Sequence, residues 1–366
     1  MLYKKKILIV TSEFPPQPGG IGNHAYHLAL YLSKQEYEVE LIADQRSKTG
    51  KLEADFDQYL PFTVVRIKRN HWRFKMYLKR IYTTYISFRN ATNVIATGKF
   101  SLWNVAFLSL FFKRKTLAVV HGSEVNFKSI LLKKSIDIAL QKMDVIVAVS
   151  EYTKSLILHL NKNIEVIPNG IDLVTWEKEN LPGICLKGSP ILTTVGRVSA
   201  RKGQLQVIQQ LPKLITHFPE LHYHCIGIPT EAEAFMKVAK DLQVQSHISF
   251  HGSLDNLLLK QILCKTDIFI MLSTESKTGD VEGFGIAILE ANALGVPAIG
   301  SRGCGIEEAI KHNNSGILID PNSTLQMLNG ITTILQNKTD YKNEAEKWAK
   351  QHDWSSIIKR YIILLK

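Results

Sequence analysis

Cysteine is scarce in this sequence, and the few cysteines are far apart. Cys185, Cys225, Cys264 and Cys304 form no C-x-x-C pair. Scattered thiols of this kind fit a reducing compartment better than the disulfide framework of a secreted domain. We therefore expect a cytoplasmic protein with free thiols.

Long apolar runs are missing as well. The best candidate for a membrane span, residues 102–112, is short and contains Asn104 and Ser109, so it favours a packed helix. Near the start, Lys4-Lys5-Lys6 precede only a short apolar run that ends at Thr11-Ser12-Glu13. This pattern predicts a first buried strand rather than a signal peptide.

The composition that remains is that of a globular protein. The chain has 366 residues, of which 45% are apolar and 21% charged, enough for two domains with ordinary cores. Its net charge of +12 is uneven: residues 1–180 hold 26 Lys and Arg against 16 Asp and Glu, whereas the remainder holds 19 against 17. We expect the first half to attract polyanions or an anionic membrane face.

Apolar strands alternate with helices along the whole chain, without a fixed-period repeat. This order predicts an α/β protein with two doubly wound parallel sheets, each covered on both faces. The segment 172–189 has no clear period and carries Pro182, Gly183 and Gly188, so we place a linker there. The predicted domains are 1–180 and 181–345, with ligands bound in a cleft at the carboxyl ends of the strands. The predicted strands are Lys6–Thr11, Val39–Ala43, Phe62–Ile67, Asn93–Ala96, Thr116–Val120, Asp144–Val149, Ile164–Ile167, Ile191–Val195, Leu221–Ile226, His247–Phe250, Asp267–Leu272, Val296–Gly300 and Gly316–Ile319.

The most informative stretch is 280–295, D-V-E-G-F-G-I-A-I-L-E-A-N-A-L-G. Glu282 and Glu290 flank a glycine-rich turn, and an apolar helix follows the turn until Gly295 and Pro297. Free amides at the start of this helix favour negative charge or hydroxyl oxygen, and carboxylates accept hydrogen bonds from sugar or ribose hydroxyls. A solvated Glu282 would be ordinary, but a charge at Glu290 within so apolar a helix needs a partner.

Two cations stand in the segment 195–203, V-G-R-V-S-A-R-K-G, at the end of the first strand of the second domain. Arg197 and Lys202 flank a short loop that opens a helix, so cations and free amides converge there. This arrangement suits a diphosphate leaving group, whose charge grows as a glycosyl bond breaks. We interpret Arg201 as a solvated surface residue.

The pattern E-x-F-G-x4-E at 282–290, with G-R and K-G at 196–203, closely resembles the signature of the retaining nucleotide-sugar glycosyltransferases of family 4. The resemblance covers nearly the whole chain. It implies a GT-B fold of two Rossmann-like domains, with the donor on the second domain and the acceptor on the first. It also implies a C-terminal helix, 346–366, that crosses back to the first domain. From the residues alone, a tail that simply closes the second domain is an equal alternative.

The resemblance further implies roles for individual residues. Glu290 is implied to hold the ribose hydroxyls, and Arg197 and Lys202 the diphosphate. The predicted catalytic residues are Glu282, His121, Arg197 and Lys202. The predicted donor-binding residues are Gly19, Gly20, Arg197, Lys202, Gly252, Leu254, Glu282, Phe284, Gly285, Ile286 and Glu290. No metal or other cofactor is expected, because the nucleotide-diphosphate sugar is itself the donor substrate.

Two segments depart from the family pattern. Ile226-Gly227-Ile228-Pro229 lacks the usual Asp-Gly, which puts some nucleotide contacts in doubt. The loop 273–281 is longer than the common version and is similar to that of mannosyltransferase-like members with lipid acceptors. The Asp55-Phe56-Asp57 pattern matches a metal site of another glycosyltransferase fold, but its polar surroundings favour a solvated loop without metal.

Basic and aromatic residues alternate in the stretch 66–89, which includes Arg66, Trp72, Arg80 and Tyr82. This composition is typical of a membrane interface or a nucleic-acid surface. No nucleic-acid fold signature accompanies it, so we interpret it as contact with an anionic membrane, in preference to a solvated helix.

Together, these observations predict a retaining, metal-independent hexosyltransferase. It would move a sugar from a nucleotide-diphosphate sugar to a hydroxyl of a lipid-linked, polysaccharide or lipopolysaccharide acceptor, in the cytoplasm or at the cytoplasmic face of a membrane. The alternatives are a sugar-nucleotide epimerase or a phosphorylase on the same fold, and a non-catalytic membrane or nucleic-acid binder. The base, the sugar, the linkage and the oligomeric state are left open.

Overall fold

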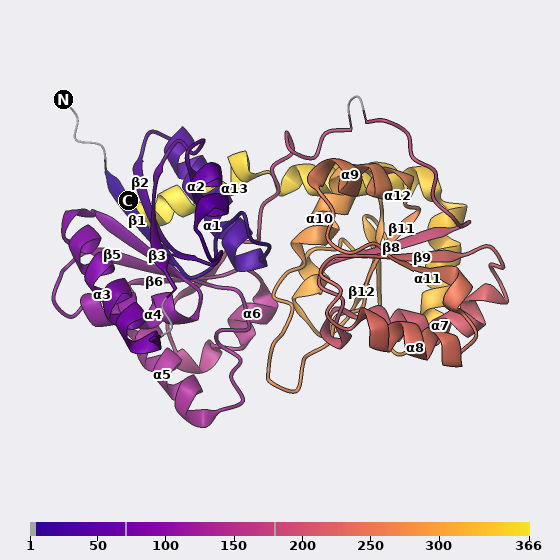
Figure 1. Cartoon of the computed structure of the whole chain (residues 1–366), viewed down its shortest axis with the longest axis horizontal. Helices are drawn as coiled ribbons and strands as arrows, with labels where there is room; N and C mark the ends of the chain where they lie inside the picture. Colours follow the sequence, from indigo (N-terminus) through magenta and orange to yellow (C-terminus); the bar gives the residue numbers. More distant parts are fainter. Residues whose placement is uncertain (1–4, 70–71, 179–180) are drawn as a thin grey trace. The chain divides into compact units, whose positions relative to one another are not determined.

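The computed structural model describes residues 5–69, 72–178 and 181–366, which form two compact units. Unit 1 comprises Met1–Gly170 with Trp354–Lys366, and unit 2 comprises Ile171–Asp353. Each unit is a parallel sheet with helices on its faces (Figure 1). The predicted domain boundary at Asn180 lies outside the described residues.

The sheet of unit 1 has seven strands in the order β3-β2-β1-β4-β5-β6-β7. Its strands are β1 (Lys6–Thr11), β2 (Glu38–Gln45), β3 (Thr63–Lys68), β4 (Asn93–Thr97), β5 (Lys115–Val120), β6 (Val145–Ala148) and β7 (Ile164–Val166). Its helices are α1 (Gly20–Lys34), α2 (Lys51–Asp57), α3 (Arg73–Asn90), α4 (Lys99–Leu108), α5 (Ile130–Gln141), α6 (Glu151–Ser155) and α13 (Trp354–Leu365), with a 3-10 turn η1 (Leu158–Leu160). The strand order reverses between β1 and β4.

The sheet of unit 2 has six strands in the order β10-β9-β8-β11-β12-β13. Its strands are β8 (Ile191–Val195), β9 (His222–Ile226), β10 (Ile248–Phe250), β11 (Ile268–Met271), β12 (Ala298–Ser301) and β13 (Gly316–Ile319). Its helices are α7 (Gln204–Ile215), α8 (Ala232–Asp241), α9 (Asn256–Lys265), α10 (Ile286–Ala293), α11 (Thr324–Gln336) and α12 (Lys338–Gln351), with 3-10 turns η2 (Ala200–Lys202), η3 (Gln245–His247) and η4 (Gly305–Glu308). Here the order reverses between β8 and β11.

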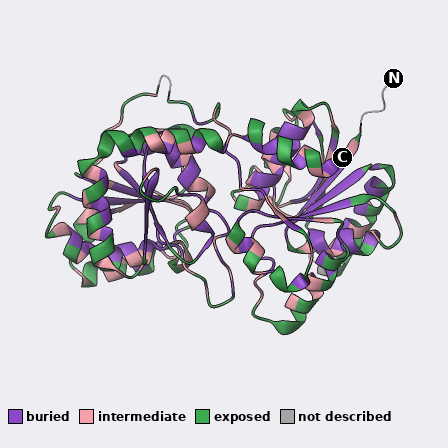
Figure 2. Cartoon of the chain, turned by 180° about the vertical axis from the view of Figure 1, so that it is seen from behind, coloured by how far each residue is buried: buried purple, intermediate pink, exposed green. Residues whose placement is uncertain are grey.

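Both sheets are buried on their two faces, as continuous apolar strands predict. Figure 2 shows buried residues filling the strands, whereas most helices turn exposed residues outward. In β1, for example, Ile7, Leu8 and Ile9 have no exposed surface. Every strand predicted from the sequence is present within a few residues of its expected ends.

The C-terminal tail, predicted as one helix over 346–366, is formed by the end of α12 and by α13. The break falls after α12. There the His352 carbonyl accepts a hydrogen bond from the Ile171 amide at 2.8 Å, and Asp353 forms an isolated β-bridge with Ile171. After the break, α13 packs on α1 within unit 1. Trp354 stacks on His27 with ring centroids 5.8 Å apart, and the Tyr361 hydroxyl lies 3.0 Å from His24 Nε2.

Two further segments differ from the sequence expectation. Residues 172–178 are not a free linker, because Trp176 is buried and Lys178 Nζ lies 2.5 Å from Glu346 Oε1 of α12. The segment predicted as a solvated polar loop is the short helix α2. In it, the buried Glu53 accepts hydrogen bonds from the backbone amides of residues 46 and 47, and Asp57 pairs with Arg66 at 2.7 Å. The Ser150 hydroxyl caps α6 by accepting a hydrogen bond from the Thr153 amide at 2.9 Å.

Candidate functional site

The candidate site of unit 2 lies where the strand order of its sheet reverses. The loop after β8 carries the cationic segment 195–203, and the chain after β11 leads to the glutamate segment 280–295. In an open parallel sheet, the carboxyl ends of strands on either side of such a reversal form the usual ligand site. Segments that are distant in sequence therefore meet here because of strand order.

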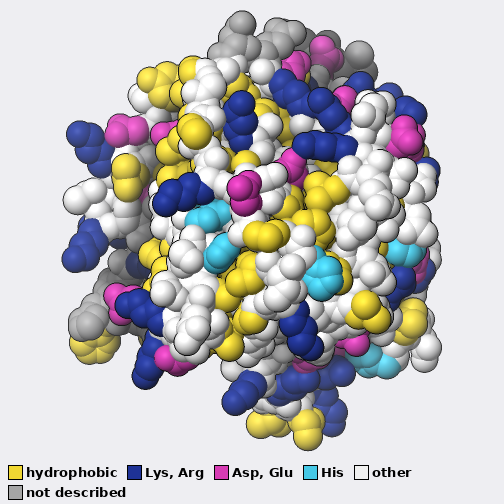
Figure 3. All heavy atoms as spheres, turned by 90° about the vertical axis from the view of Figure 1, so that its right-hand side faces the viewer, with side chains coloured by type: hydrophobic (Ala, Val, Ile, Leu, Met, Phe, Trp, Pro, Cys, Tyr) yellow, Lys and Arg dark blue, Asp and Glu magenta, His cyan; other side chains and the backbone are white. Residues whose placement is uncertain are grey.

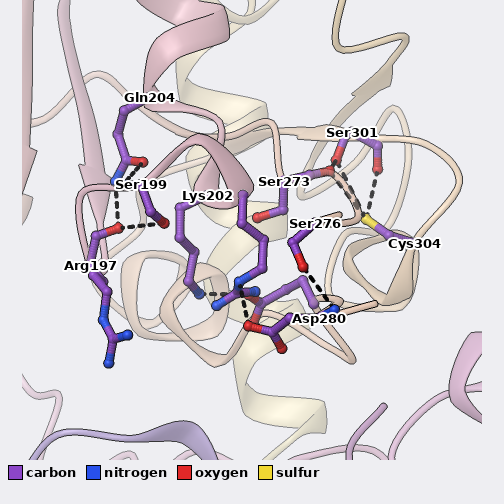
Figure 4. A network of polar contacts seen from close by, with 11 residues as sticks. Arg197, Ser199, Lys202, Gln204, Ser273, Ser276, Asp280, Ser301 and Cys304 are labelled. Atoms are coloured by element: carbon purple, nitrogen blue, oxygen red, sulfur yellow. Dashed lines mark hydrogen bonds and ion pairs between the residues drawn. The ribbon is translucent and has the colours of Figure 1, made fainter. Parts of the chain in front are cut away.

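Glycines let the cationic turn fit closely against its surroundings. The chain at Gly203 has a φ of +87°, and a Cβ there would lie 2.3 Å from the Leu272 carbonyl oxygen. A Cβ on Gly196 would contact the Lys202 side chain at 3.4 Å. Buried Gln204 ties the turn together by donating to the Arg197 carbonyl at 3.2 Å (Figure 4).

Glu282 is held by two cations of this turn. Its Oε2 atom lies 2.6 Å from Lys202 Nζ and 2.9 Å from Arg201 Nη1. Burial alone would raise the pKa of Glu282, but Lys202 and Arg201 lower that pKa to about 2. The carboxylate is therefore ionised at all physiological pH values, with its second oxygen available to accept a hydrogen bond.

The prediction that Arg201 is merely solvated is wrong. Besides Glu282, its Nε atom pairs with Asp280 Oδ2 at 3.1 Å. Arg197 is the cation that stays exposed: its guanidinium has no hydrogen-bond or ion-pair partner among the described residues. Figure 4 shows Arg197 extending away from Lys202 and Asp280. The sequence indicated two cations, Arg197 and Lys202, for an anionic ligand. The structure adds Arg201, which pairs with the carboxylates of Asp280 and Glu282.

Glu290 lies on α10, which begins at Ile286 after Gly285 with a φ of +90°. Its surroundings are apolar, and burial raises its pKa to about 7, although nearby Lys202 opposes this. In contrast to Glu282, this carboxyl changes charge near neutral pH. The first amides of α10 have no acceptor within the helix, so they are open to an oxygen-rich ligand.

The other predicted residues of unit 2 lie at the neighbouring strand ends. The Gly252 carbonyl accepts a hydrogen bond from the Gly227 amide at 2.8 Å, and Leu254 is partly exposed in the following turn. Gly227 has a φ of +135°, and a Cβ on it would lie 2.3 Å from the Gly196 carbonyl oxygen. The segment without the family's Asp-Gly therefore packs directly against the cationic turn.

In unit 1, Gly19 and Gly20 follow β1 at the start of α1. A Cβ on Gly19 would come within 2.7 Å of Glu13 Oε2, whereas a Cβ on Gly20 would meet no atom within 4 Å. A side chain at position 19 would therefore require the Glu13 carboxylate to move, whereas position 20 has room for a side chain.

His121 ends β5 in unit 1 and is buried. Its Nε2 atom lies 2.9 Å from the Thr97 hydroxyl, and burial lowers its pKa to about 3, so its ring is neutral. Its amide donates to Glu124 Oε1 at 2.6 Å. Glu124 is fully buried, and its Oε2 atom finds no hydrogen-bond partner within the described part of the chain. Burial raises the pKa of Glu124 to about 7.

Sequence reasoning missed Glu124, Asp280 and the role of Arg201. Glu124 follows His121 by three residues, a spacing that allows a side chain to reach back to an amide, and that signal was available. The partners of Arg201 were not available, because they come from segment 280–282 across the sheet.

Other features of the described residues do not form this kind of site. A hollow of about 350 Å³ lies at the amino ends of β11 and β12, where Lys338 pairs with Asp267 and Lys178 with Glu346. Among the described residues, no three His, Cys, Asp or Glu side chains are placed to hold a metal ion. No helix in that part of the chain is both long and apolar enough to cross a membrane.

Two family models match the chain. That of the glycosyl transferases group 1 matches residues 183–352, and that of glycosyltransferase family 4 matches residues 18–175. The chain is 25% identical over 351 residues to a GDP-mannose-dependent alpha-(1-6)-phosphatidylinositol monomannoside mannosyltransferase of Mycobacterium tuberculosis, covering 90% of this chain and 89% of the relative. It is also 25% identical to the N-acetyl-alpha-D-glucosaminyl L-malate synthase of Bacillus anthracis, over 64% of this chain and 61% of that one.

Solved structures with the same fold include two glycosyltransferases. Sucrose-phosphate synthase from Thermosynechococcus elongatus has a TM-score of 0.80 at 17% identity, covering 99% of this chain and 98% of that one. Anabaena HepE, in complex with UDP and glucose, has a TM-score of 0.78 at 17% identity, covering 99% of both chains. The expected GT-B fold is confirmed.

Proposed function

Because the chain belongs to the group 1 glycosyltransferases, we propose that it moves a sugar from a nucleotide-diphosphate sugar to a hydroxyl of a lipid-linked, polysaccharide or lipopolysaccharide acceptor. We propose further that the anomeric configuration is retained and that no metal takes part. The observation that carries the donor assignment is the ion-paired Glu282 with Lys202 and Arg201, beside the start of α10.

Arg197 and Lys202 would bind the donor diphosphate and stabilise it as it leaves. Among the residues that the structure describes, the Arg197 guanidinium has no partner to give up, and Lys202 pairs with Glu282 through one oxygen. Charge-assisted hydrogen bonds to phosphate are strong, and cations that face the leaving group act where charge grows in the transition state. These cations supply the neutralisation for which other transferases use a metal ion.

Glu282 and Glu290 would hold the two sugar rings of the donor. The free oxygen of Glu282 and the amides of Phe284, Gly285 and Ile286 suit hydroxyls of the transferred sugar. Glu290 suits the ribose hydroxyls, since accepting hydrogen bonds favours its ionised form and would lower its pKa from about 7. In the mechanism we propose, the acceptor attacks on the face of the leaving group, and a phosphate oxygen takes its proton.

We assign acceptor binding to unit 1 and propose that this unit contacts an anionic membrane from the cytoplasmic side. Exposed apolar side chains lie beside lysines on its helices. At the start of α5, Ile130 and Leu131 are 78% and 80% exposed and precede Lys133 and Lys134. Figure 3, which faces the unit 2 side, shows basic side chains mixed with acidic, hydrophobic and other side chains.

Two basic residues of the stretch 66–89 turn inward: Arg66 pairs with Asp57, and Arg80 is buried against Asp44. Most other described basic and aromatic residues of the stretch are exposed: Lys68, Arg69, Trp72, Phe74, Lys75, Tyr77, Lys79, Tyr82, Tyr85 and Arg89. Liposome flotation tests the membrane proposal. The double variant I130S/L131S should bind anionic vesicles several-fold more weakly, whereas L325S, which removes an exposed leucine from α11 in unit 2, should bind them normally.

The donor is tested by incubating the full chain with GDP-mannose, UDP-glucose and UDP-N-acetylglucosamine. We expect a thermal shift with one of them, and release of its nucleoside diphosphate that depends on a glycan or lipid-linked acceptor. Conversion of the donor without acceptor would identify an epimerase, and a requirement for phosphate would identify a phosphorylase. The anomeric configuration of the product, read by NMR, decides retention.

A further inference from the structure

Arg201 connects the loop 273–281 to the cationic turn at two places. Its carbonyl accepts a hydrogen bond from the Thr274 amide at 2.9 Å. Its guanidinium pairs with Asp280 at 3.1 Å near the other end of the loop. The residue therefore holds both ends of a loop that leads directly to Glu282.

The loop is also closed on itself between these two attachments. The Ser276 amide donates to the Asp280 carbonyl at 2.9 Å, and the Asp280 amide donates to the Ser276 hydroxyl at 2.9 Å (Figure 4). Arg201 joins this closed turn to the cationic turn, and the Ser301 hydroxyl holds its first residue by donating to the Ser273 carbonyl at 2.7 Å.

Arg201 and Lys202 meet the same carboxylate oxygen of Glu282, yet only Lys202 is proposed to reach the donor. When Lys202 turns to a diphosphate, Glu282 would be a largely buried carboxylate without a cation unless Arg201 stays. An unpaired charge in that position is costly. Asp280 helps to keep Arg201 in place, because it gives the guanidinium a second anion.

We propose that Arg201 is a positioning residue for sugar transfer: it keeps Glu282 charged and oriented, and the 273–281 loop attached, while Lys202 binds the donor diphosphate. The proposal rests on the proposed function. It distinguishes Arg201 from Arg197, which stands in the same loop, carries the same charge and has no contact with Glu282.

The pH dependence of donor binding separates this role from a purely structural one. In an R201Q variant, Glu282 is paired with Lys202 before binding and unpaired afterwards, so its pKa would rise on binding. The complex would then take up a proton, and the loss of affinity would be greatest at alkaline pH and shrink as the pH falls. The other titratable groups that interact with Glu282 or with its two cations are Asp280, Glu290 and Cys304, and they are the same in wild type and variant.

The experiment is calorimetric titration of wild type, R201Q, R201K and R197Q with GDP-mannose and with UDP-glucose at pH 6, 7 and 8. We expect R201Q to bind the donor about tenfold more weakly at pH 8 and to approach wild type at pH 6. Its binding should take up more protons than wild type, measured in buffers of different ionisation enthalpy. R201K should recover most of the affinity, and R197Q should lose affinity equally at all three pH values.

The outcomes separate the two proposals. If wild type binds neither nucleotide sugar, the proposed donors are wrong and the role of Arg201 is wrong with them. If wild type binds one donor and R201Q loses affinity equally at every pH, or loses none, Arg201 has only a structural part or none, and the proposed function stands. Circular dichroism of R201Q and R201K identifies a variant that fails to fold, in which case R201K alone decides.

Discussion

The two units carry polar groups at the carboxyl ends of their strands, called here the carboxyl edge of each sheet. The electrostatics of these two edges are opposite. In each, the strand order reverses once and polar residues follow the strands beside the reversal. In unit 2, the edge carboxylate Glu282 is paired with two cations and has a pKa of about 2. In unit 1, the edge carboxylate Glu124 is buried against a backbone amide and has a pKa of about 7.

The difference teaches that topology places a site but does not choose its ligand. The edge of unit 2 has the exposed Arg197 beside the ion-paired Arg201 and Lys202, and it suits an anion such as a diphosphate. The edge of unit 1 has a neutral histidine and a carboxyl that is half protonated at neutral pH, so it suits uncharged hydroxyl groups. We therefore assign the donor to unit 2 and the acceptor to unit 1.

The largest expected effect is a loss of transfer activity when the charged edge of unit 2 is disrupted. The variant K202Q removes a diphosphate partner and leaves Glu282 with one cation, so kcat/KM for sugar transfer should fall about 10²- to 10³-fold. The matched change in unit 1 is K99Q, which removes an exposed lysine near Glu124 and should cost less than about fivefold. Steady-state kinetics measures both, and equal losses would contradict the assignment of the phosphates to unit 2.

The second effect concerns stability at the neutral edge. Because the pKa of Glu124 is about 7 in the folded chain against 4.5 when unfolded, the native state keeps a proton that the unfolded state loses between these values. Stability therefore falls as the pH rises from about 4.5 to 7, by an amount on the order of 3 kcal/mol. The variant E124Q lacks this loss of stability. The melting temperature of E124Q relative to that of wild type should therefore rise from pH 5 to pH 8.

Glu282 gives the opposite trend and serves as the comparison. Its pKa is lowered, so its contribution to stability is present above pH 4.5 and is lost as the pH falls toward 2. The variant E282Q should therefore be less stable than wild type at pH 7, and the difference should shrink below pH 4.5. A melting temperature of E124Q that runs parallel to wild type over pH 5–8 would rule out a raised pKa at Glu124.

The fold was predictable because its signal is local, whereas the charge balance of the site was not. Apolar strands such as 6–11 and 191–195 can be recognised without knowledge of their neighbours, and glycine-rich turns mark the ends of the strands. By contrast, the ion pair of Arg201 with Glu282 depends on β8 lying next to β11. Alternation of strands and helices predicts a parallel sheet but not the order of its strands.

The helices that the sequence failed to predict were hidden for another reason. The sequence of α2 suggests a polar loop because Glu53 and Asp57 are charged and would be expected to face solvent. In the structure, both carboxylates have partners within the protein. α5 begins with exposed apolar residues, so its outward face does not show the usual polar pattern. In both helices, the residue types suggest the wrong degree of burial, and the actual burial is known only from the packed structure.

The third effect tests whether the neutral edge touches the sugar. The variant H121A removes the ring that lies 2.9 Å from the Thr97 hydroxyl and should lower kcat/KM about tenfold to a hundredfold. The affinity for the nucleotide sugar should change much less than in K202Q, because no phosphate contact is lost. Titration calorimetry beside kinetics separates the two, and a loss of donor affinity as large as that of K202Q would contradict the comparison between the edges.

The smallest effect concerns the glycines after β1 and sharpens the comparison within unit 1. A Cβ at position 20 meets no atom within 4 Å, and Gly20 is the first residue of α1, so the fold gives no reason for glycine there. Alanine should stabilise the helix by up to about 1 kcal/mol. If the donor diphosphate approaches this backbone, G20A should nevertheless weaken nucleotide-sugar binding a few-fold. The control, G19A, lies before the helix and displaces only the flexible end of the Glu13 side chain, so it should leave stability nearly unchanged. A more stable G20A that binds the donor as wild type does would remove Gly20 from the donor site, leaving the charged edge of unit 2 to hold the phosphates alone.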